Sequence, residues 1–170
     1  MSNRRKVYWD ASCFICFLNR AELHRRKICE DVLYHAQDRK IELWTSVWTI
    51  VEVVRPNRHS LPSSGKLTPE QIRKIQAMFE WDWLKKVQVD QIIATKAVEL
   101  QRDYNLRAGD SIHAATAIRI KADVLQRWDR DFDRVKHIVP VEDPQKLTIQ
   151  AELIEGFKKQ IGPIPEDFSS

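Results

Sequence analysis

Four acidic residues that lie far apart in the sequence are the strongest sign of chemistry in this chain: Asp10, Glu52, Asp110 and Asp129. Each lies in or beside an apolar segment that would carry it into a shared crevice. Ionised carboxylates are costly to remove from water and to bring together unless cations or hydrogen bonds compensate. We therefore expect a bound divalent cation between them. A set of carboxylate oxygens without a supporting His or Cys set suits Mg²⁺ or Mn²⁺ better than zinc.

Such a cation usually works on phosphates, where it polarises the scissile group, helps to ionise a water and neutralises the departing oxygen. Hydrolysis of a phosphodiester is the natural reaction. Ser12 could direct its hydroxyl toward a water or a phosphate, and Arg55 and Arg130 could contact substrate phosphates. A solvated charged face would explain the two arginines nearly as well. No residue here visibly reads a 2′-hydroxyl, so the residues alone leave DNA and RNA both open.

Short apolar runs that alternate with helical patterns must position these acids. Strands are expected at residues 7–9, 41–44, 86–89, 124–125 and 137–141. Helices are expected at residues 11–18, 21–39, 47–54, 69–83, 91–102, 111–121 and 148–159, with Thr45-Ser46, Thr68 and Asp90 as caps. Residues 56–66 form a candidate basic flap. This alternation predicts an α/β fold with a mostly parallel sheet that is covered on both faces.

In such sheets, ligands bind beyond the carboxyl ends of the strands. Asp10 follows the first strand, Asp129 follows the fourth, and Asp110 lies near the start of a helix. Glu52 would reach the same place from its own helix. The pattern therefore brings all four acids to one edge of the sheet.

Length and composition favour one folded unit. The chain has 170 residues, of which 43% are hydrophobic, which is enough for a single core. We expect residues 1–142 to form the main domain and residues 143–170 to form a C-terminal extension that packs on it or on a partner. The net charge of +4 is compatible with a polyanionic partner but does not establish one.

The cysteines and the apolar runs bear on location. Cys13 and Cys16 are spaced C-x-x-C, but no second pair completes a zinc cage, so we expect buried thiols. Three cysteines without a secretory signal indicate reduced thiols in the cytoplasm. The first apolar run is too short and too polar to span a membrane, so no membrane association is expected.

Four segments carry a resemblance to a known family: residues 7–12, the apolar helix around Glu52, residues 109–117 and residues 129–132. In order and spacing they resemble PIN-domain nucleases, and among these the VapC-type toxin ribonucleases of bacterial toxin–antitoxin pairs. The resemblance covers roughly residues 6–141. It implies a three-layer α/β/α sandwich with a central parallel sheet, metal-dependent cleavage of RNA, homodimers and inhibition by an antitoxin protein. It also implies that Asp10 and Asp110 are the most direct metal ligands, with Glu52 and Asp129 completing the acidic pocket.

Two features depart from the family pattern. Arg127 stands where a small hydroxyl residue commonly precedes the last acid by two places, and the tail beyond Pro144 is longer than the minimal domain requires. Both support a rival hypothesis, in which the chain is a non-catalytic PIN-like module that binds RNA or a protein. A dinucleotide-binding enzyme is set aside because the four glycines form no G-x-G-x-x-G motif.

Each acid also has a simpler interpretation when it is taken alone. Asp10 and Asp110 could be helix caps, and Glu52 could lie on an exposed stripe or pair with Arg55. Asp129 could be a loop acid. Asp131 shares that interpretation, with partners among Arg127, Arg130 and Arg134. One shared site explains all four acids better than four coincidences.

His113 lies three residues after Asp110 on the same helical face. It could be a further ligand. We expect instead a packed histidine that is bonded to a backbone group.

Overall fold

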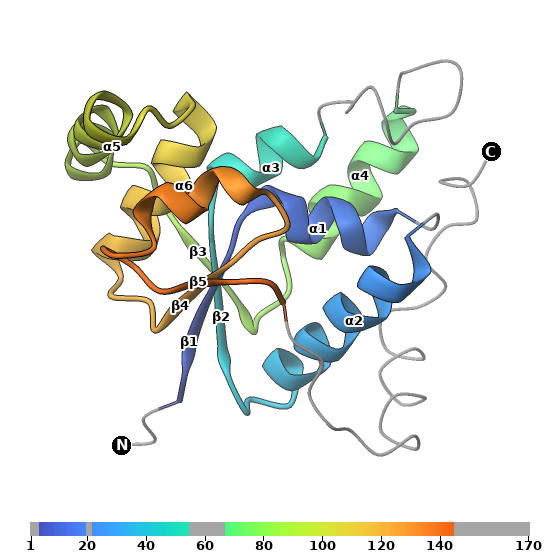
Figure 1. The fold of residues 1–170 in the computed structure, drawn as a ribbon. Helices are drawn as coiled ribbons and strands as arrows, with labels where there is room; N and C mark the ends of the chain where they lie inside the picture. Colours follow the sequence, from blue (N-terminus) through green and yellow to red (C-terminus); the bar gives the residue numbers. More distant parts are fainter. Residues whose placement is uncertain (1–3, 20–21, 55–66, 145–170) are drawn as a thin grey trace.

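A five-stranded sheet forms the centre of the computed structural model, which describes residues 4–19, 22–54 and 67–144 (Figure 1). The strands are β1 (Lys6–Trp9), β2 (Glu42–Ser46), β3 (Leu84–Val87), β4 (Val124–Gln126) and β5 (Val141–Glu142). Their order is β3-β2-β1-β4-β5, and every neighbouring pair is parallel. The predicted parallel sheet is confirmed.

Helices cover both faces of this sheet, which confirms the three-layer sandwich. They are α1 (Ala11–Leu18), α2 (Leu23–Gln37), α3 (Trp48–Val53), α4 (Pro69–Met78), α5 (Gln91–Tyr104), α6 (Ala108–Arg119) and the 3-10 helix η1 (Arg130–Val135). In Figure 1, α1, α2 and α4 lie to one side of the strands, and α5, α6 and η1 lie to the other. Within the described ranges, none of the helices combines the length and apolar character of a membrane span.

The alternation of side chains along β1 explains why two cores form. Successive side chains of a strand point to opposite faces of the sheet. Val7 and Trp9 therefore lie in the core beneath α1 and α2, whereas Tyr8 lies in the core beneath α5 and α6. Leu125, the partner of Tyr8 in β4, lies in the same core as Tyr8.

Two of the three predicted caps are confirmed, whereas the N-cap of α3 is Val47, which makes no side-chain cap bond, rather than Thr45-Ser46. The Asp90 carboxylate accepts a hydrogen bond from the backbone N–H of Ile93 (2.9 Å) at the start of α5. Thr68 and Gln71 form a reciprocal capping box at the start of α4. At the start of α3, Ser46 accepts a hydrogen bond from the backbone N–H of Trp48 (3.1 Å). Local sequence thus fixes where these helices begin.

The C-terminal end of the domain corrects one strand boundary. The strand expected at residues 137–141 is only Val141–Glu142. Before it, the backbone N–H groups of Ile138 and Val139 both bond to the carbonyl of Val135, at 2.9 and 3.2 Å, and so continue the turn of η1. The apolar run was misread because Val139 is buried by that turn rather than by strand pairing.

Other boundaries also differ from the expectation, among them that of β3, which spans Leu84–Val87 rather than residues 86–89. Helix α4 ends at Met78 rather than at Trp83, because the N–H groups that follow bond to carbonyls three residues back, and Trp81 and Trp83 then stack at 4.7 Å. Helix α6 begins at Ala108 rather than at Ser111, so Asp110 lies inside its first turn.

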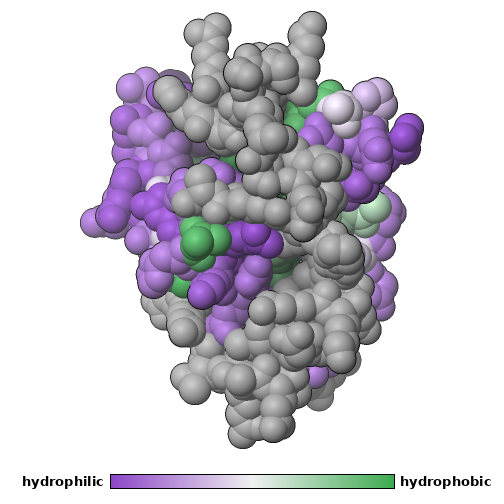
Figure 2. Space-filling model, turned by 90° about the vertical axis from the view of Figure 1, so that its right-hand side faces the viewer, coloured by the Kyte–Doolittle hydropathy of each residue, from purple (hydrophilic) through white to green (hydrophobic). Residues whose placement is uncertain are grey.

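Several predictions lie outside the described residues. They are the helix at 148–159, the basic flap at 56–66 and Arg55. The division between residues 142 and 143 stays a prediction. Figure 2 shows that the coloured surface on one side of the molecule is mostly hydrophilic, with small hydrophobic patches between polar residues.

Candidate active site

The carboxyl edge of the sheet holds the candidate site. In the sheet, β2 lies on one side of β1 and β4 lies on the other. The chain order of the strands therefore reverses at β1, and open α/β sheets bind ligands at such a position. Asp10 directly follows β1, Asp129 follows β4, and Asp110 lies in the first turn of α6. The topology therefore brings these three acids to one edge, as the sequence predicts.

Asp10 is a helix cap and a member of this cluster at once. Its side chain is buried, with the residue only 4% exposed. Its Oδ1 accepts hydrogen bonds from the Ser12 hydroxyl (2.6 Å) and from the backbone N–H of Cys13 (3.3 Å). Burial raises the pKa of Asp10, while His113 and these hydrogen bonds act in the opposite direction. The cap fixes the orientation of the carboxylate in the interior.

Ser12 connects two parts of the site. Its hydroxyl donates to Asp10 and accepts a hydrogen bond from the backbone N–H of Trp128 (2.9 Å). The segment that leads to Asp129 is thereby tied to the first turn of α1. The hydroxyl proton is directed at Asp10, so Ser12 positions that carboxylate. Contact between Ser12 and a substrate stays a prediction.

Asp110 is the acid whose charge is least compensated. Among the described residues, none forms a hydrogen bond or an ion pair with its carboxylate. Burial, together with the negative charges of Asp129 and Asp10, raises the pKa of Asp110 to about 6, and His113 opposes the shift. Three acids from three separate segments therefore act on one another.

Glu52 reaches the first turn of α6 because Gly109 leaves room for it. A Cβ atom added at Gly109 would collide with Oε1 of Glu52. The Glu52 carboxylate thus rests against the residue that precedes Asp110. Its side chain is 29% exposed, so it does not lie on a solvated stripe. The alternative pairing with Arg55 involves a residue outside the described part of the chain.

His113 is packed, as expected, but its hydrogen-bond partners correct the sequence interpretation. Its Nε2 lies 2.6 Å from Oε2 of Glu52, and its Nδ1 lies 2.8 Å from the hydroxyl of Tyr8. Both partners are side chains rather than backbone groups. The roles of Tyr8, Gly109 and His113 were missed. The alternation of β1, which turns Tyr8 toward the layer of α6, was the available signal.

Asp129 is the exposed member of the set. Its Oδ1 accepts a hydrogen bond from the backbone N–H of Asp131 (2.9 Å) and caps η1. The loop-acid interpretation holds for Asp131, which pairs with Arg134 (3.3 Å) and lies 3.9 Å from Arg107. For Asp129, no cation of the described residues lies within ion-pair distance.

Arg127 is buried, with the residue only 3% exposed. Its guanidinium pairs with the carboxylates of Asp133 in η1 and Asp143 after β5. Burial would lower the pKa of Arg127, but the two carboxylates more than offset this and raise it. Arg127, which stands where the family pattern has a small hydroxyl residue, therefore stabilises the loop that bears Asp129.

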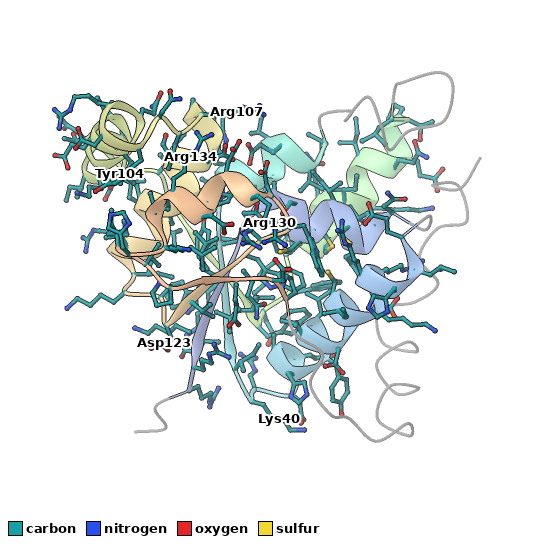
Figure 3. All side chains as sticks on the ribbon, viewed as in Figure 1. Lys40, Tyr104, Arg107, Asp123, Arg130 and Arg134 are labelled. Carbon is teal, nitrogen blue, oxygen red and sulfur yellow. The ribbon has the colours of Figure 1, made fainter. Side chains whose placement is uncertain are left out.

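Exposed arginines flank the acids. The side chain of Arg130 is 76% exposed and that of Arg107 is 82% exposed. Figure 3 shows Arg107, Arg130 and Arg134 around α6 and η1, whereas Lys40 and Asp123 lie toward the opposite end of the strands. Positive charge is thus available beside the acidic cluster to attract a polyanion.

The chemistry of this donor set fits a hard divalent cation. It consists of carboxylates whose mutual repulsion His113 offsets only in part. Among the described residues, however, no group of three or more His, Cys, Asp or Glu side chains stands close enough together to ligate a metal. The fit therefore rests on donor type and electrostatics rather than on a formed coordination sphere.

Known proteins share this fold. A family model described as PIN domain matches residues 7–138. A toxin–antitoxin complex from Klebsiella pneumoniae is 18% identical with a TM-score of 0.55, covering 83% of this chain and 99% of that chain. VapC20 of Mycobacterium tuberculosis, described as a sarcin-ricin loop cleaving toxin, is 13% identical with a TM-score of 0.57, covering 75% and 92%. VapBC2 of Rickettsia felis, bound to a DNA fragment from their promoter, is 14% identical with a TM-score of 0.59, covering 82% and 99%.

No curated protein matches the sequence. At identities below 20%, the similarity to the solved structures shows the fold alone. The family model is more specific, since it spans most of the chain and includes Asp10, Glu52, Asp110 and Asp129. This chain belongs to the PIN-domain family of nucleases.

Proposed function

We propose that this protein is a metal-dependent endoribonuclease that hydrolyses RNA phosphodiester bonds, and that it is the toxin of a toxin–antitoxin pair. One observation carries the nuclease proposal. Asp10, Asp110 and Asp129 come from three separate segments, and the charges of Asp10 and Asp129 act on Asp110 at the carboxyl edge of the sheet, where His113 offsets only part of their effect. A divalent cation would supply the remaining compensation.

In this proposal Asp10 and Asp110 are the principal ligands of Mg²⁺ or Mn²⁺, and Glu52 and Asp129 complete the pocket. The bound cation supplies charge neutralisation at the phosphate and a lowered pKa for an attacking water. Ser12 holds the Asp10 carboxylate in one orientation. Burial of Asp10 limits the water around that carboxylate and strengthens its electrostatic interactions.

Substrate binding is assigned to positive charge at the rim of the site. Arg130 follows Asp129 directly, and its side chain is largely exposed, so it can bind a phosphate without any change in core packing. Arg55 is proposed for the same role from its charge and from its position three residues after Glu52. The first turn of α6, a helix of 12 residues, adds a partial positive charge near Asp110.

The RNA substrate and the antitoxin partner rest on resemblance. One of the similar structures is described as a toxin–antitoxin complex, another as a sarcin-ricin loop cleaving toxin, and a third as VapBC2 bound to a DNA fragment from their promoter. We propose the same type of activity here, with a cognate antitoxin as inhibitor, a homodimer as the assembly and the cytoplasm as the location. Sedimentation of the purified chain tests the dimer.

Cleavage of labelled single-stranded RNA tests the nuclease. We expect activity with Mg²⁺ or Mn²⁺ that EDTA abolishes and that falls at least 100-fold in Asp10→Asn, because that variant removes one ligand charge. Asp82→Asn is the matched control, since Asp82 is 79% exposed and pairs with Arg39 outside the site. Full activity of folded Asp10→Asn would refute the assignment. Equal cleavage of a DNA strand would refute only the RNA specificity.

The toxin assignment has a separate test. Expression of the chain should arrest bacterial growth, and co-expression of a small protein encoded beside it should restore growth. The Asp10→Asn variant should be harmless. Harmless expression of an active enzyme would remove the toxin assignment and leave the nuclease assignment intact.

The non-catalytic alternative predicts RNA or protein binding without cleavage and without dependence on metal. Its support was Arg127 and the long tail beyond Pro144. The structure gives Arg127 ion-pair partners of its own, Asp133 and Asp143. The tail lies outside the described residues, so the RNA cleavage assay decides between the alternative and the nuclease.

A further inference from the structure

We infer that Tyr8 and His113 form a buried hydrogen-bonded relay that positions the Glu52 carboxylate in the acidic site. Tyr8, His113 and Glu52 come from β1, α6 and α3, so the relay joins three elements. The inference rests on the proposed function in one respect only, the assignment of Glu52 to a cation site.

The geometry is direct. The Tyr8 hydroxyl lies 2.8 Å from His113 Nδ1, and His113 Nε2 lies 2.6 Å from Glu52 Oε2. Tyr8 is fully buried and His113 is 2% exposed. The rings of Tyr8 and His113 pack edge to face with 5.9 Å between their centroids, and the centroid of the Phe132 ring lies 6.5 Å from that of the imidazole. The imidazole is therefore held by packing as well as by its hydrogen bonds.

The proton positions follow from the partners. A carboxylate can only accept a hydrogen bond, so His113 carries its proton on Nε2 and donates it to Glu52. In the neutral imidazole that carries this proton, Nδ1 accepts the hydroxyl proton of Tyr8. In this form the two hydrogen bonds run in one direction, from Tyr8 toward Glu52.

The relay uses one carboxylate oxygen and leaves the other without a hydrogen bond from any described residue. Oε2 of Glu52 is bonded to His113, while Oε1 faces Gly109. Helix α3 has only six residues, so it gives a long side chain little support of its own. Without the relay, the Glu52 side chain would sample several rotamers. With it, Oε1 is held beside Gly109, in the first turn of α6.

Titration of the full-length protein with Mn²⁺, followed by electron paramagnetic resonance, tests the positioning role. We expect Tyr8→Phe and His113→Leu to weaken Mn²⁺ binding about 10-fold to 100-fold, as removal of groups that orient metal ligands generally does. His113→Gln should recover part of the affinity, because its amide can donate to Glu52. A purely structural histidine would show lower thermal stability and an unchanged Mn²⁺ affinity in the folded protein.

The molecule offers a matched control. Tyr104 and His137 form a second tyrosine–histidine pair, with 3.3 Å between the Tyr104 hydroxyl and His137 Nε2, at an exposed position. Tyr104→Phe makes the same chemical change as Tyr8→Phe and should leave Mn²⁺ affinity unaltered. If His113→Leu fails to fold, Tyr8→Phe still decides, because it removes a single oxygen.

A second readout does not depend on metal. In the metal-free protein labelled with ¹⁵N-histidine, the Nε2–H resonance of His113 should move in Glu52→Gln and in Tyr8→Phe, but not in Tyr104→Phe. A resonance that ignores both substitutions overturns the relay.

The outcomes separate the relay from the proposed function. If Asp10→Asn abolishes Mn²⁺ binding while Tyr8→Phe and His113→Leu bind normally, the relay is wrong and the nuclease proposal stands. If the unaltered protein binds no Mn²⁺, the proposed metal site is wrong and the resonance alone decides the relay.

Discussion

Glu52 and Asp129 are both carboxylates of the candidate site, but the protein holds them in opposite ways. Glu52 is bonded directly by His113, which a fully buried tyrosine holds in turn. Asp129 is exposed and bonded by the backbone of its own loop. Arg127 stabilises that loop through ion pairs with Asp133 and Asp143 and makes no ion pair with Asp129.

This difference predicts that contacts at Glu52 affect activity and that contacts around Asp129 affect stability. Contacts made to a carboxylate itself decide where its oxygens lie, so their loss should reduce activity more than stability. Contacts made to a loop decide whether the loop stays folded, so their loss should reduce stability more than activity. Substitutions on the two sides should therefore give opposite patterns.

Gly109→Ala should have the largest effect, and mainly on activity. The added methyl group collides with Oε1 of Glu52, whose flexible side chain can rotate away. We expect RNA cleavage to fall about 100-fold, as displacement of a positioned catalytic group does, while the unfolding free energy changes by less than about 1 kcal/mol because alanine favours the helix. Cleavage rates and urea unfolding measure the two effects. Ala108→Gly, in the same turn, should instead be active and less stable; normal activity of Gly109→Ala would contradict the packing argument.

Arg127→Met should show the reverse pattern. It removes the buried guanidinium and leaves Asp133 and Asp143, which are 40% and 46% exposed and can be hydrated. We expect the unfolding free energy to fall by about 2 kcal/mol, the scale for loss of a buried charged hydrogen-bond partner. Cleavage well below the melting temperature should fall less than about threefold. A large loss of activity with intact stability would show that Arg127 acts on Asp129 or on substrate.

Asp110→Asn should stabilise the metal-free protein in a pH-dependent way. The pKa of Asp110 is raised to about 6, so the folded state binds more protons than the unfolded state between about pH 4 and 6, and stability falls as pH rises through that range. Removing the charge should add roughly 1–2 kcal/mol to the unfolding free energy at pH 8 and nothing at pH 3.5, after allowance for partial solvent screening. Urea unfolding with EDTA at both pH values, with Asp82→Asn as control, measures this. An equal effect at both pH values would count against charge repulsion as the cause.

Arg130→Gln should have the smallest effect. The side chain is 76% exposed and only 3.9 Å contacts reach Asp133 and Asp143, so the unfolding free energy should change by less than about 0.5 kcal/mol. The KM for RNA should rise roughly threefold at low salt and less at high salt, because a phosphate contact is screened. Arg39→Gln, away from the site, should leave KM unaltered. A KM that does not respond would remove Arg130 from substrate binding.

Most of the fold could be predicted from the sequence, for a local reason. Apolar runs of strand length alternate with amphipathic helices, and caps such as Asp90 and Thr68 act within three residues of themselves. Where boundaries were wrong, short turns of three or four residues bury apolar side chains that the sequence assigned to a strand or to a longer helix. Val139 is buried by the turn after η1, and Trp83 is buried after its stacking partner Trp81 has left the helix.

The sequence by itself determined which acids could gather. Each of the four stands at a strand end or on a helix that the parallel topology directs to one edge, and this follows from chain order and periodicity. Only the tertiary structure decided what holds them, because Tyr8, Gly109 and His113 meet Glu52 through contacts between residues up to 105 positions apart. Periodicity says which face a side chain occupies; the distance and direction of a hydrogen bond between two elements depend on how those elements pack.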